Sequence, residues 1–195
     1  MDEMAKLYFY YGAMGSTKTA NALMMEYNYR ERNQNPLLVK TSLDKRDGDL
    51  IIRSRIGLQK ECILLETLTE MPPEEIIKFD AIIVDEVQFA TTEQIDFLAY
   101  IVDELRVPVL CFGLRTDFQL NLFEGSKRLL EIADKILEIK TMCWCGAKAT
   151  CNARYDENGI IRKREQVVLG SNHNYVALCR KHFIRGQLGP STQND

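Results

Sequence analysis

A glycine-containing segment near the start of the chain has the residue types of a phosphate-binding loop. The segment Gly12-Ala13-Met14-Gly15-Ser16-Thr17-Lys18-Thr19 lies between an apolar run and a helical pattern. In such a loop, successive backbone N–H groups surround a phosphate at the start of a helix. A lysine then neutralises the outer phosphate oxygens and a hydroxyl holds Mg²⁺. Residues 12–19 therefore predict a nucleotide-phosphate site, with Lys18 on the phosphates and Thr19 on the metal.

Thr17 departs from the usual pattern of this loop because it stands where a second glycine is expected. A threonine can replace glycine there only if its φ is negative and no neighbour crowds its Cβ. The alternative interpretation is a glycine-rich turn that merely begins a helix with an exposed lysine.

Two adjacent carboxylates follow a second apolar run. The run 81–84 ends at Asp85 and Glu86. Two carboxylates at the end of a buried strand need cations to compensate them, and in phosphate-loop proteins an acid here completes the Mg²⁺ shell. We interpret Asp85 as the Mg²⁺ ligand and Glu86 as the group that orients or deprotonates a nucleophile. A solvated acid pair at a strand end is the alternative.

A cluster of cysteines in the last third of the chain has the residue types of a zinc site. Cys143 and Cys145 are separated by 33 residues from the pair Cys179 and His182. Three thiolates and one imidazole form a closed tetrahedral set, which is typical of structural rather than catalytic Zn²⁺. Cys151 is a rival ligand, although its distance from Cys145 suits loop packing better.

The elements that must position these groups alternate between short apolar runs and helical patterns. Such alternation predicts an α/β fold with a parallel sheet flanked by helices, as in P-loop NTPases, over residues 1–142. The predicted strands lie at 7–11, 37–39, 62–65, 81–84, 107–112 and 135–141, with helices after the first and fourth runs and over 126–133.

The pattern changes beyond residue 142. Short polar and glycine-containing stretches surround the cysteines, and the segment 156–159 (Asp-Glu-Asn-Gly) is typical of a hairpin turn. So small a segment buries little apolar surface and needs additional stabilisation, such as a bound zinc ion. We expect a zinc-binding domain over 143–188 and a flexible tail over 189–195.

Composition narrows the function classes. The chain has 195 residues, is 46% hydrophobic and 27% charged, and carries a net charge of −3, which is typical of a globular protein. No apolar run approaches the roughly 20 residues that span a bilayer, and no secretory signal is visible. We therefore expect a cytoplasmic protein without membrane contact. Residues 143–185 carry eight Lys and Arg against three acids, which keeps a zinc-ribbon nucleic-acid binder open as an alternative.

Taken together, these motifs resemble the thymidine kinases of the type that includes the cytosolic animal enzyme and many bacterial ones. The resemblance covers nearly the whole chain. Its marks are the loop 12–19, Asp85-Glu86-x-Gln88-Phe89, the segment 112–118, the metal set above, and the segment 166–170 shortly before Tyr175. Ser171 departs from the family pattern, as Thr17 does, because glycine is usual at both positions.

The resemblance implies a role for each matching residue. It implies that loop 12–19 binds the phosphates of ATP, that Gln88 belongs to the same nucleotide site, and that Glu86 accepts the proton of the nucleoside 5′-hydroxyl. Four apolar residues match the wall around the thymine: Met14, Phe89, Leu114 and Phe118. A loop over about 150–178 is expected to cover the nucleoside. Its base contacts come from the main chain of Val167, Val168, Leu169 and Gly170, with Tyr175 beside the substrate. Arg46 matches loosely as a phosphate-facing residue.

The expected activity is ATP-dependent phosphorylation of thymidine, and also of deoxyuridine, in pyrimidine nucleotide salvage. The family further implies a homotetramer and feedback by thymidine triphosphate. The rival is a zinc-ribbon P-loop ATPase acting on nucleic acid; a motor of that class needs a second lobe or an arginine finger, and 195 residues leave little room for a lobe. A degenerate kinase that binds nucleotide without turnover is a further alternative, motivated by Thr17.

Overall fold

Six parallel strands form the sheet that supports the site. The computed structural model describes residues 5–43, 50–162 and 174–190. The strand order is β5-β2-β6-β7-β1-β8, and every pairing in this sheet is parallel. The strands are β1 (Leu7–Tyr11), β2 (Pro36–Lys40), β5 (Ile63–Leu64), β6 (Ala81–Asp85), β7 (Val109–Gly113) and β8 (Lys135–Glu138). The predicted fold class is confirmed.

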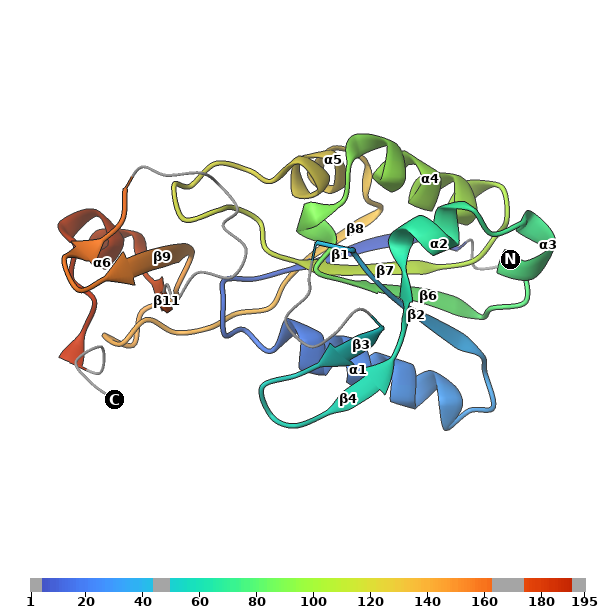
Figure 1. Ribbon diagram of the computed structural model, residues 1–195, viewed down its shortest axis with the longest axis horizontal. Helices are drawn as coiled ribbons and strands as arrows, with labels where there is room; N and C mark the ends of the chain where they lie inside the picture. Colours follow the sequence, from blue (N-terminus) through green and yellow to red (C-terminus); the bar gives the residue numbers. More distant parts are fainter. Residues whose placement is uncertain (1–4, 44–49, 163–173, 191–195) are drawn as a thin grey trace.

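Helices cover both faces of this sheet (Figure 1). Helix α1 (Lys18–Arg30) lies on one face, while the other face carries α2 (Leu65–Thr69), α3 (Pro73–Ile76), α4 (Thr92–Asp103) and α5 (Glu124–Ile132). Within β6, Ile82 and Val84 pack on the side of α4, whereas Ala81 and Ile83 pack on the side of α1. The strand is therefore buried on both faces, which explains why its sequence lacks alternation.

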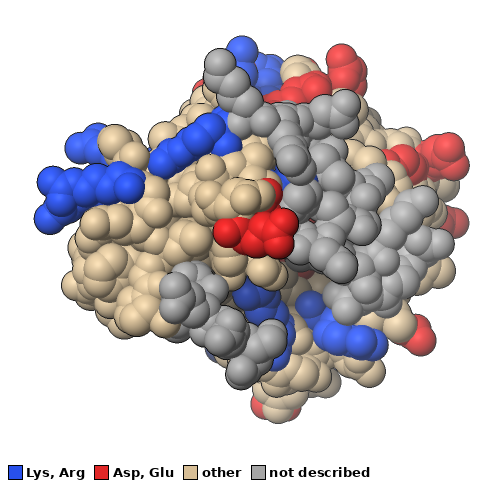
Figure 2. Space-filling model, turned by 60° about the vertical axis from the view of Figure 1, so that its left-hand side comes forward, with Lys and Arg blue, Asp and Glu red and all other residues tan. Residues whose placement is uncertain are grey.

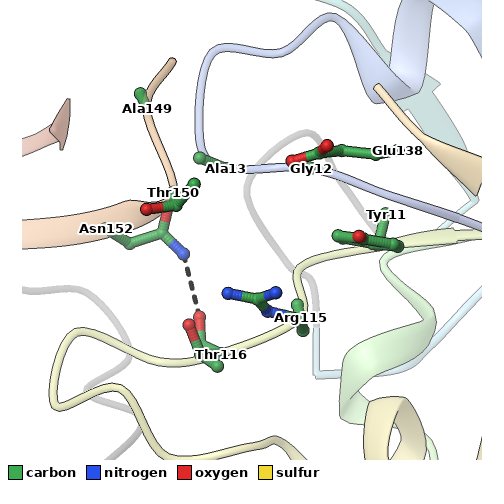
Figure 3. Close-up of a pocket in the computed structure, with 9 residues that line it drawn as sticks. All are labelled: Tyr11, Gly12, Ala13, Arg115, Thr116, Glu138, Ala149, Thr150 and Asn152. Carbon is green, nitrogen blue, oxygen red and sulfur yellow. Dashed lines mark hydrogen bonds between the residues drawn. The ribbon is translucent and has the colours of Figure 1, made fainter. Parts of the chain in front are cut away.

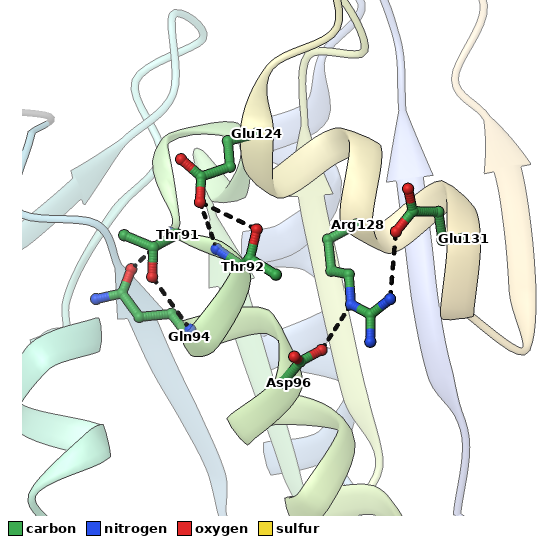
Figure 4. Close-up of polar contacts among 7 residues, drawn as sticks. All are labelled: Thr91, Thr92, Gln94, Asp96, Glu124, Arg128 and Glu131. Carbon is green, nitrogen blue, oxygen red and sulfur yellow. Dashed lines mark hydrogen bonds and ion pairs between the residues drawn. The ribbon is translucent and has the colours of Figure 1, made fainter.

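Polar contacts join α4 and α5 on the outside of the molecule (Figure 4). A capping box at Thr91 begins α4. Glu124 at the start of α5 accepts hydrogen bonds from the backbone N and Oγ1 of Thr92, at 2.7 and 3.0 Å. Arg128 pairs with Asp96 at 2.6 Å. Such exposed pairs contribute about 0.2–1 kcal/mol each, so they fix the helix register more than they stabilise the fold.

A two-stranded hairpin was not predicted. Strands β3 (Ile51–Arg53) and β4 (Gln59–Glu61) pair antiparallel and lie beside α1 (Figure 1). The strand predicted over 62–65 is shorter than expected, because Leu65 already begins α2.

The cysteine-rich segment folds around its own small sheet. Strands β9 (Cys151–Asp156), β10 (Gly159–Ile160) and β11 (Asn174–Leu178) form a sheet of order β10-β9-β11, followed by α6 (Arg180–Arg185). The predicted turn at 156–159 joins β9 to β10. The small core behind this sheet consists of Cys143, Ala149, Cys151, Ala153, Leu178 and Phe183.

Two features of the surface bear on possible partners. Within the described part of the chain, no helix combines the length and apolarity needed to cross a bilayer. On the face drawn in Figure 2, the Lys and Arg side chains stand in separate groups with Asp and Glu between them. The coloured residues of that face thus form no continuous basic patch of the kind that tracks a nucleic-acid backbone.

Candidate active site

The carboxyl ends of β1, β7 and β6 are adjacent at one edge of the sheet, and the predicted phosphate and acid motifs leave from there. The loop 12–17 follows β1, Leu114 follows β7, and Glu86 follows β6. A cavity of about 580 Å³ lies at this edge. It is lined by residues 14–20 of the loop and α1, residues 53–56 of the hairpin, Glu86 and Leu114. Ligands of open α/β sheets bind in this position.

Lys18 lies against the loop that precedes it. Its Nζ donates hydrogen bonds to the carbonyl oxygens of Ala13 and Gly12, at 2.9 and 3.2 Å, and to Ser16 Oγ at 3.3 Å. The side chain is buried, yet Lys18 also lines the cavity. The alternative of a merely exposed lysine at a helix start is therefore wrong.

The backbone at Thr17 does not meet the condition stated for replacing glycine. Its φ is 60° and its ψ is 23°, in the left-handed region, whereas the condition required a negative φ. This conformation costs a β-branched residue roughly 1–3 kcal/mol. Local hydrogen bonds offset part of the cost: Thr17 Oγ1 donates to Ser16 O at 2.6 Å, and Asn21 Nδ2 donates to Thr17 Oγ1 at 3.1 Å and to Thr17 O at 2.9 Å.

Asp85 is a buried carboxyl group in contact with the phosphate-loop residues. Burial and the neighbouring charge of Glu86 raise its pKa to about 7. A hydrogen bond with the Thr19 side chain, a backbone amide and the charge of Lys18 act in the opposite direction. The two predicted Mg²⁺ ligands, Thr19 and Asp85, are thus directly hydrogen-bonded. A hydroxyl and a carboxylate are oxygen donors that suit this hard cation.

Glu86 is held in a defined position by its surroundings. Its φ of 52° is again left-handed, and its carbonyl oxygen accepts from Thr41 Oγ1 at 3.3 Å. Gln88, in the 3₁₀ turn η1 (Val87–Phe89), donates from Nε2 to Glu86 Oε2 at 2.5 Å and accepts from Leu114 N at 3.0 Å. A Cβ at Gly113 would come within 2.7 Å of Gln88 Oε1, so only glycine fits beside this amide.

The four predicted wall residues divide into two pairs. Met14 and Leu114 both line the cavity. Phe89 packs edge-on against Phe123, with ring centroids 5.6 Å apart. Phe118 is buried beneath the guanidinium of Arg154, whose Cζ lies 5.2 Å from the ring centroid. Neither phenylalanine is among the residues that line this cavity.

Asn152, on β9 of the small sheet, joins the two parts of the molecule and was missed by the sequence analysis. Its Oδ1 accepts from Met14 N at 2.8 Å and its Nδ2 donates to Thr116 O at 2.8 Å. The side chain is 4% exposed, and Figure 3 shows it aimed at the loop that carries Thr116 and Arg115. The available signal was the polar alternation of Asn152 and Arg154 around Ala153, since alternate strand residues share one face.

The predicted zinc ligands lie together. The ligand atoms of Cys143, Cys145, Cys179 and His182 are all within 4.8 Å of one another. His182 Nδ1 is 3.4 Å from the sulfurs of Cys143 and of Cys179. Among the described residues, Cys151 is outside this group and packs in the small core instead. Three sulfurs and one nitrogen at this spacing fit tetrahedral Zn²⁺.

The local environment favours a thiolate in this cluster. Burial opposes ionisation of Cys143, but backbone amides of Cys145 and Cys179 and the ring of His182 lower its pKa to about 6. Trp144 stacks on the His182 ring, with centroids 4.3 Å apart, and donates from Nε1 to Gln187 O at 3.2 Å. The cluster is therefore covered by an aromatic ring and by the segment after α6.

Part of the predicted base-binding loop is outside the described residues. The structure does not describe the predicted base-contact residues Val167, Val168, Leu169 and Gly170. The predicted phosphate-facing residue Arg46 also lies outside the described residues. Tyr175 is described: it lies on β11, where it pairs in register with Arg154 on β9.

The fold defines a phosphate-loop α/β protein, and its cavity is lined by the loop, Glu86, Met14 and Leu114. The family model described as thymidine kinase matches residues 5–183, and the chain belongs to this family. The resemblance inferred from the motifs is thereby confirmed, and the chain is a nucleoside kinase. The alternative of a nucleic-acid ATPase is not favoured.

The sequence of this chain aligns with curated relatives along nearly their full length. A thymidine kinase of Zymomonas mobilis is 49% identical over 187 residues, covering 93% of this chain and 97% of that protein. A thymidine kinase of Shewanella oneidensis is 46% identical, covering 92% of this chain and 97% of that protein. A thymidine kinase of Legionella pneumophila (strain Lens) is also 46% identical, covering 95% of this chain and 92% of that protein. Among solved structures, a Bacteroides Pif1 helicase with ADP-AlF3 and ssDNA aligns with a TM-score of 0.45 and 16% identity. That alignment covers 73% of this chain but only 39% of the helicase.

Proposed function

We propose that this protein transfers the γ-phosphoryl group of ATP to the 5′-hydroxyl of thymidine, and also of deoxyuridine, in pyrimidine nucleotide salvage. The observation that carries the proposal is the convergence of Lys18 and Glu86 on one cavity, with Asp85 hydrogen-bonded to the helix start beside it. The same cavity has apolar Met14 and Leu114 on its wall. A flat, neutral nucleoside suits an apolar slot next to a charged phosphate site.

The proposed mechanism assigns the phosphates of ATP to the backbone and lysine of loop 12–19. Thr19 and Asp85 would hold Mg²⁺, which neutralises charge on the β- and γ-phosphate oxygens when bound. Lys18 must then leave its loop carbonyls to meet those oxygens. Glu86 accepts the proton of the attacking hydroxyl, and Gln88 orients that carboxylate through the hydrogen bond between their side chains. In-line positioning supplies much of the remaining rate acceleration.

Nucleoside recognition is assigned to both parts of the molecule. The thymine would lie against Met14, Phe89, Leu114 and Phe118, with its polar edge on the main chain of 167–170 and Tyr175 nearby. Main-chain groups can satisfy that edge without leaving a buried polar atom unpaired. We infer two domains, 1–142 and 143–188; residues 191–195 of the predicted tail lie outside the described residues. The second is braced by structural Zn²⁺ on the three cysteines and His182.

The family relationship also motivates proposals about assembly and regulation. We infer a homotetramer in the cytoplasm that thymidine triphosphate inhibits as an end product. Light scattering coupled to gel filtration tests the assembly state. Initial rates measured with added thymidine triphosphate test the inhibition.

One kinetic comparison tests the central proposal. Thymidine, deoxyuridine and deoxycytidine are each offered with Mg-ATP, and nucleoside monophosphate is quantified. We expect rapid phosphorylation of thymidine and deoxyuridine and little of deoxycytidine. ATP hydrolysis that DNA stimulates, without phosphorylation of any nucleoside, would instead support the nucleic-acid ATPase and overturn the proposal.

A further inference from the structure

The hairpin of β3 and β4 brings two arginines to the phosphate side of the cavity. Residues 53–56, which include Arg53 and Arg55, line the cavity together with the phosphate loop and the start of α1. The turn of the hairpin lies near the first residues of α1 (Figure 1). Arg55 stands in the turn itself, one residue beyond the buried Ser54.

The turn that carries Arg55 is well ordered by hydrogen bonds. Ser54 N donates to Leu58 O at 2.7 Å, Leu58 N donates to Ser54 Oγ at 3.0 Å, and Gly57 N donates to Ser54 O at 3.1 Å. Ser54 is thus bonded across the turn through its backbone and its side chain. Because little backbone freedom remains in this turn, the Arg55 side chain starts from a fixed point at the cavity wall.

The hairpin is also fixed to the main sheet and to α1. The fully buried Lys40, at the end of β2, donates from Nζ to Ile51 O at 3.1 Å. Lys60 on β4 is 3.5 Å from Glu26, a buried carboxylate on α1 that also pairs with Arg30. These contacts tie both strands of the hairpin to the elements that carry the phosphate loop.

Arg53 and Arg55 are not equivalent on this hairpin. Arg53 donates from Nε to Gln59 Oε1 at 2.9 Å, so its guanidinium is bonded across the strand pair to the residue opposite it on β4. Arg55 follows the last residue of β3 by two positions and is exposed at the cavity. Arg55 is therefore the arginine that is placed to reach a ligand in the cavity.

Among the described residues that line the cavity, the cations are Lys18, Arg53 and Arg55. A bound ATP brings about four negative charges, and Glu86 and Asp85 add carboxyl groups at the same edge of the sheet. The phosphate loop contributes one lysine, Lys18. A guanidinium is suited to complete such a site because its planar fork binds two phosphate oxygens at once.

We propose that Arg55 binds the terminal phosphates of the nucleotide and stabilises the charge of the transferred phosphoryl group, as an arginine supplied from within the same chain. This inference rests on the proposed function and adds a residue to it. The hairpin then serves as the opposite wall of the phosphate site. Its fixed attachment to α1 keeps Arg55 and Lys18 on one ligand.

The test compares Arg55→Ala and Arg55→Lys with a matched control, Arg32→Ala, an exposed arginine near the other end of α1. Binding of a non-hydrolysable Mg-ATP analogue is measured by calorimetry, and kcat and KM are measured for ATP and thymidine. We expect Arg55→Ala to weaken analogue binding at least tenfold. We also expect it to lower kcat by about 10²–10³, which reaches the lower end of the effect of an arginine finger in phosphoryl transfer. Arg55→Lys should retain more analogue binding and a higher kcat than Arg55→Ala, but less than wild type. The KM for thymidine should stay within threefold of wild type in both variants.

The outcomes separate this inference from the proposed function. Analogue binding and kcat in Arg55→Ala that match both wild type and Arg32→Ala would overturn the role of Arg55. A wild-type protein that binds the analogue but phosphorylates no nucleoside would overturn the proposed function, while the calorimetric comparison would still decide whether Arg55 contacts phosphate. A lowered melting temperature of Arg55→Ala that accounts for the loss would also count against the inference.

Discussion

The two non-glycine residues with left-handed backbone at the cavity belong to its two chemical motifs. Thr17 has a φ of 60° in the phosphate loop, and Glu86 has a φ of 52° after β6. Both conformations are costly and persist only where surrounding contacts determine them. Asn21 supplies those contacts for Thr17, and Thr41 contributes a hydrogen bond to the backbone of Glu86. The strain thus lies where backbone direction decides which groups face the ligand.

Replacing Thr17 by glycine should relieve this strain. We expect Thr17→Gly to raise the free energy of unfolding by about 1 kcal/mol, since glycine adopts positive φ without penalty, although its greater freedom when unfolded reduces the gain. Asn21→Ala is the matched control: it removes the two side-chain hydrogen bonds but leaves the threonine strained, so it should lower stability. Chemical denaturation of both variants measures the difference. A destabilised Thr17→Gly would show that the threonine contacts outweigh the backbone cost.

Glu86→Gln separates proton transfer from nucleotide binding. A glutamine keeps the shape of the side chain but cannot accept the proton, so we expect kcat to fall by about 10²–10⁴. Binding of a non-hydrolysable Mg-ATP analogue should stay within a few fold of wild type. Calorimetry and initial rates measure the two effects. Equal losses in binding and turnover would contradict the assigned role of Glu86 and indicate a structural one.

The buried Asp85 makes stability depend on pH in the absence of nucleotide and Mg²⁺. Its pKa is raised from 3.8 to about 7, so the folded state favours the protonated carboxyl group. Stability from this group is complete below about pH 4 and is lost as the pH rises through 7. Relative to wild type, Asp85→Asn should therefore gain up to about 4 kcal/mol between pH 4 and 7 and change little above pH 7.

Denaturation of wild type and Asp85→Asn from pH 5 to pH 8 in magnesium-free buffer checks this dependence. Ionisation of the cysteine cluster is common to both proteins and cancels in the difference. A difference that is constant with pH, or that shrinks as the pH rises, would contradict the buried state of Asp85.

At the scale of elements, sequence patterns located the main sheet but missed the hairpin that packs beside it. Short apolar runs identified β1, β6 and β7, and the run of β6 lacks alternation because that strand is buried on both faces. The hairpin of β3 and β4 was missed because its residues are mostly exposed and lack a clear period of two. The candidate phosphate, acid and zinc residues lie at fixed motif spacings and could be listed from the sequence. Asn152 had only the signal of its alternation with Arg154, and Arg55 had no motif, since both meet the site through contacts between distant elements.

Asn152 couples the small sheet to the phosphate loop and offers a test at this scale. Asn152→Ala leaves Met14 N and Thr116 O without these partners, which costs about 1–3 kcal/mol for each buried group left unsatisfied. We expect a higher KM for thymidine and a lower unfolding free energy. Asn152→Asp is the matched control, because it keeps an acceptor for Met14 N but has no donor for Thr116 O. Its KM should lie between those of wild type and alanine; unchanged kinetics in both variants would contradict the coupling.

At the scale of the whole molecule, the small sheet contacts the phosphate loop and the segment 116–118 through the polar side of β9. Asn152 is bonded to Met14 and Thr116 and Arg154 lies over Phe118, while Cys151 and Ala153 pack in the small core. The order of the cluster and the position of Asn152 therefore depend on the same strand. A metal bound at the cluster would brace the small sheet whose Asn152 contacts Met14 of the phosphate loop.

Loss of the metal should consequently impair the nucleoside site more than the nucleotide site. Trp144 is the only tryptophan in the chain and stacks on His182, so its fluorescence reports on the cluster alone. We expect Cys179→Ala to lose bound zinc by elemental analysis, to shift the Trp144 emission, and to raise the KM for thymidine at least tenfold. Analogue binding at Lys18 should change less, because the small sheet contacts the loop at Met14, whereas Lys18 begins α1 and is hydrogen-bonded to the carbonyl oxygens of Gly12 and Ala13. Cys62→Ala, which removes a thiol buried in the main core, is the control for loss of a cysteine and should keep both zinc and the emission spectrum. Equal damage to nucleoside and nucleotide binding in Cys179→Ala would show that the small sheet and the large domain do not act as separate supports of the site.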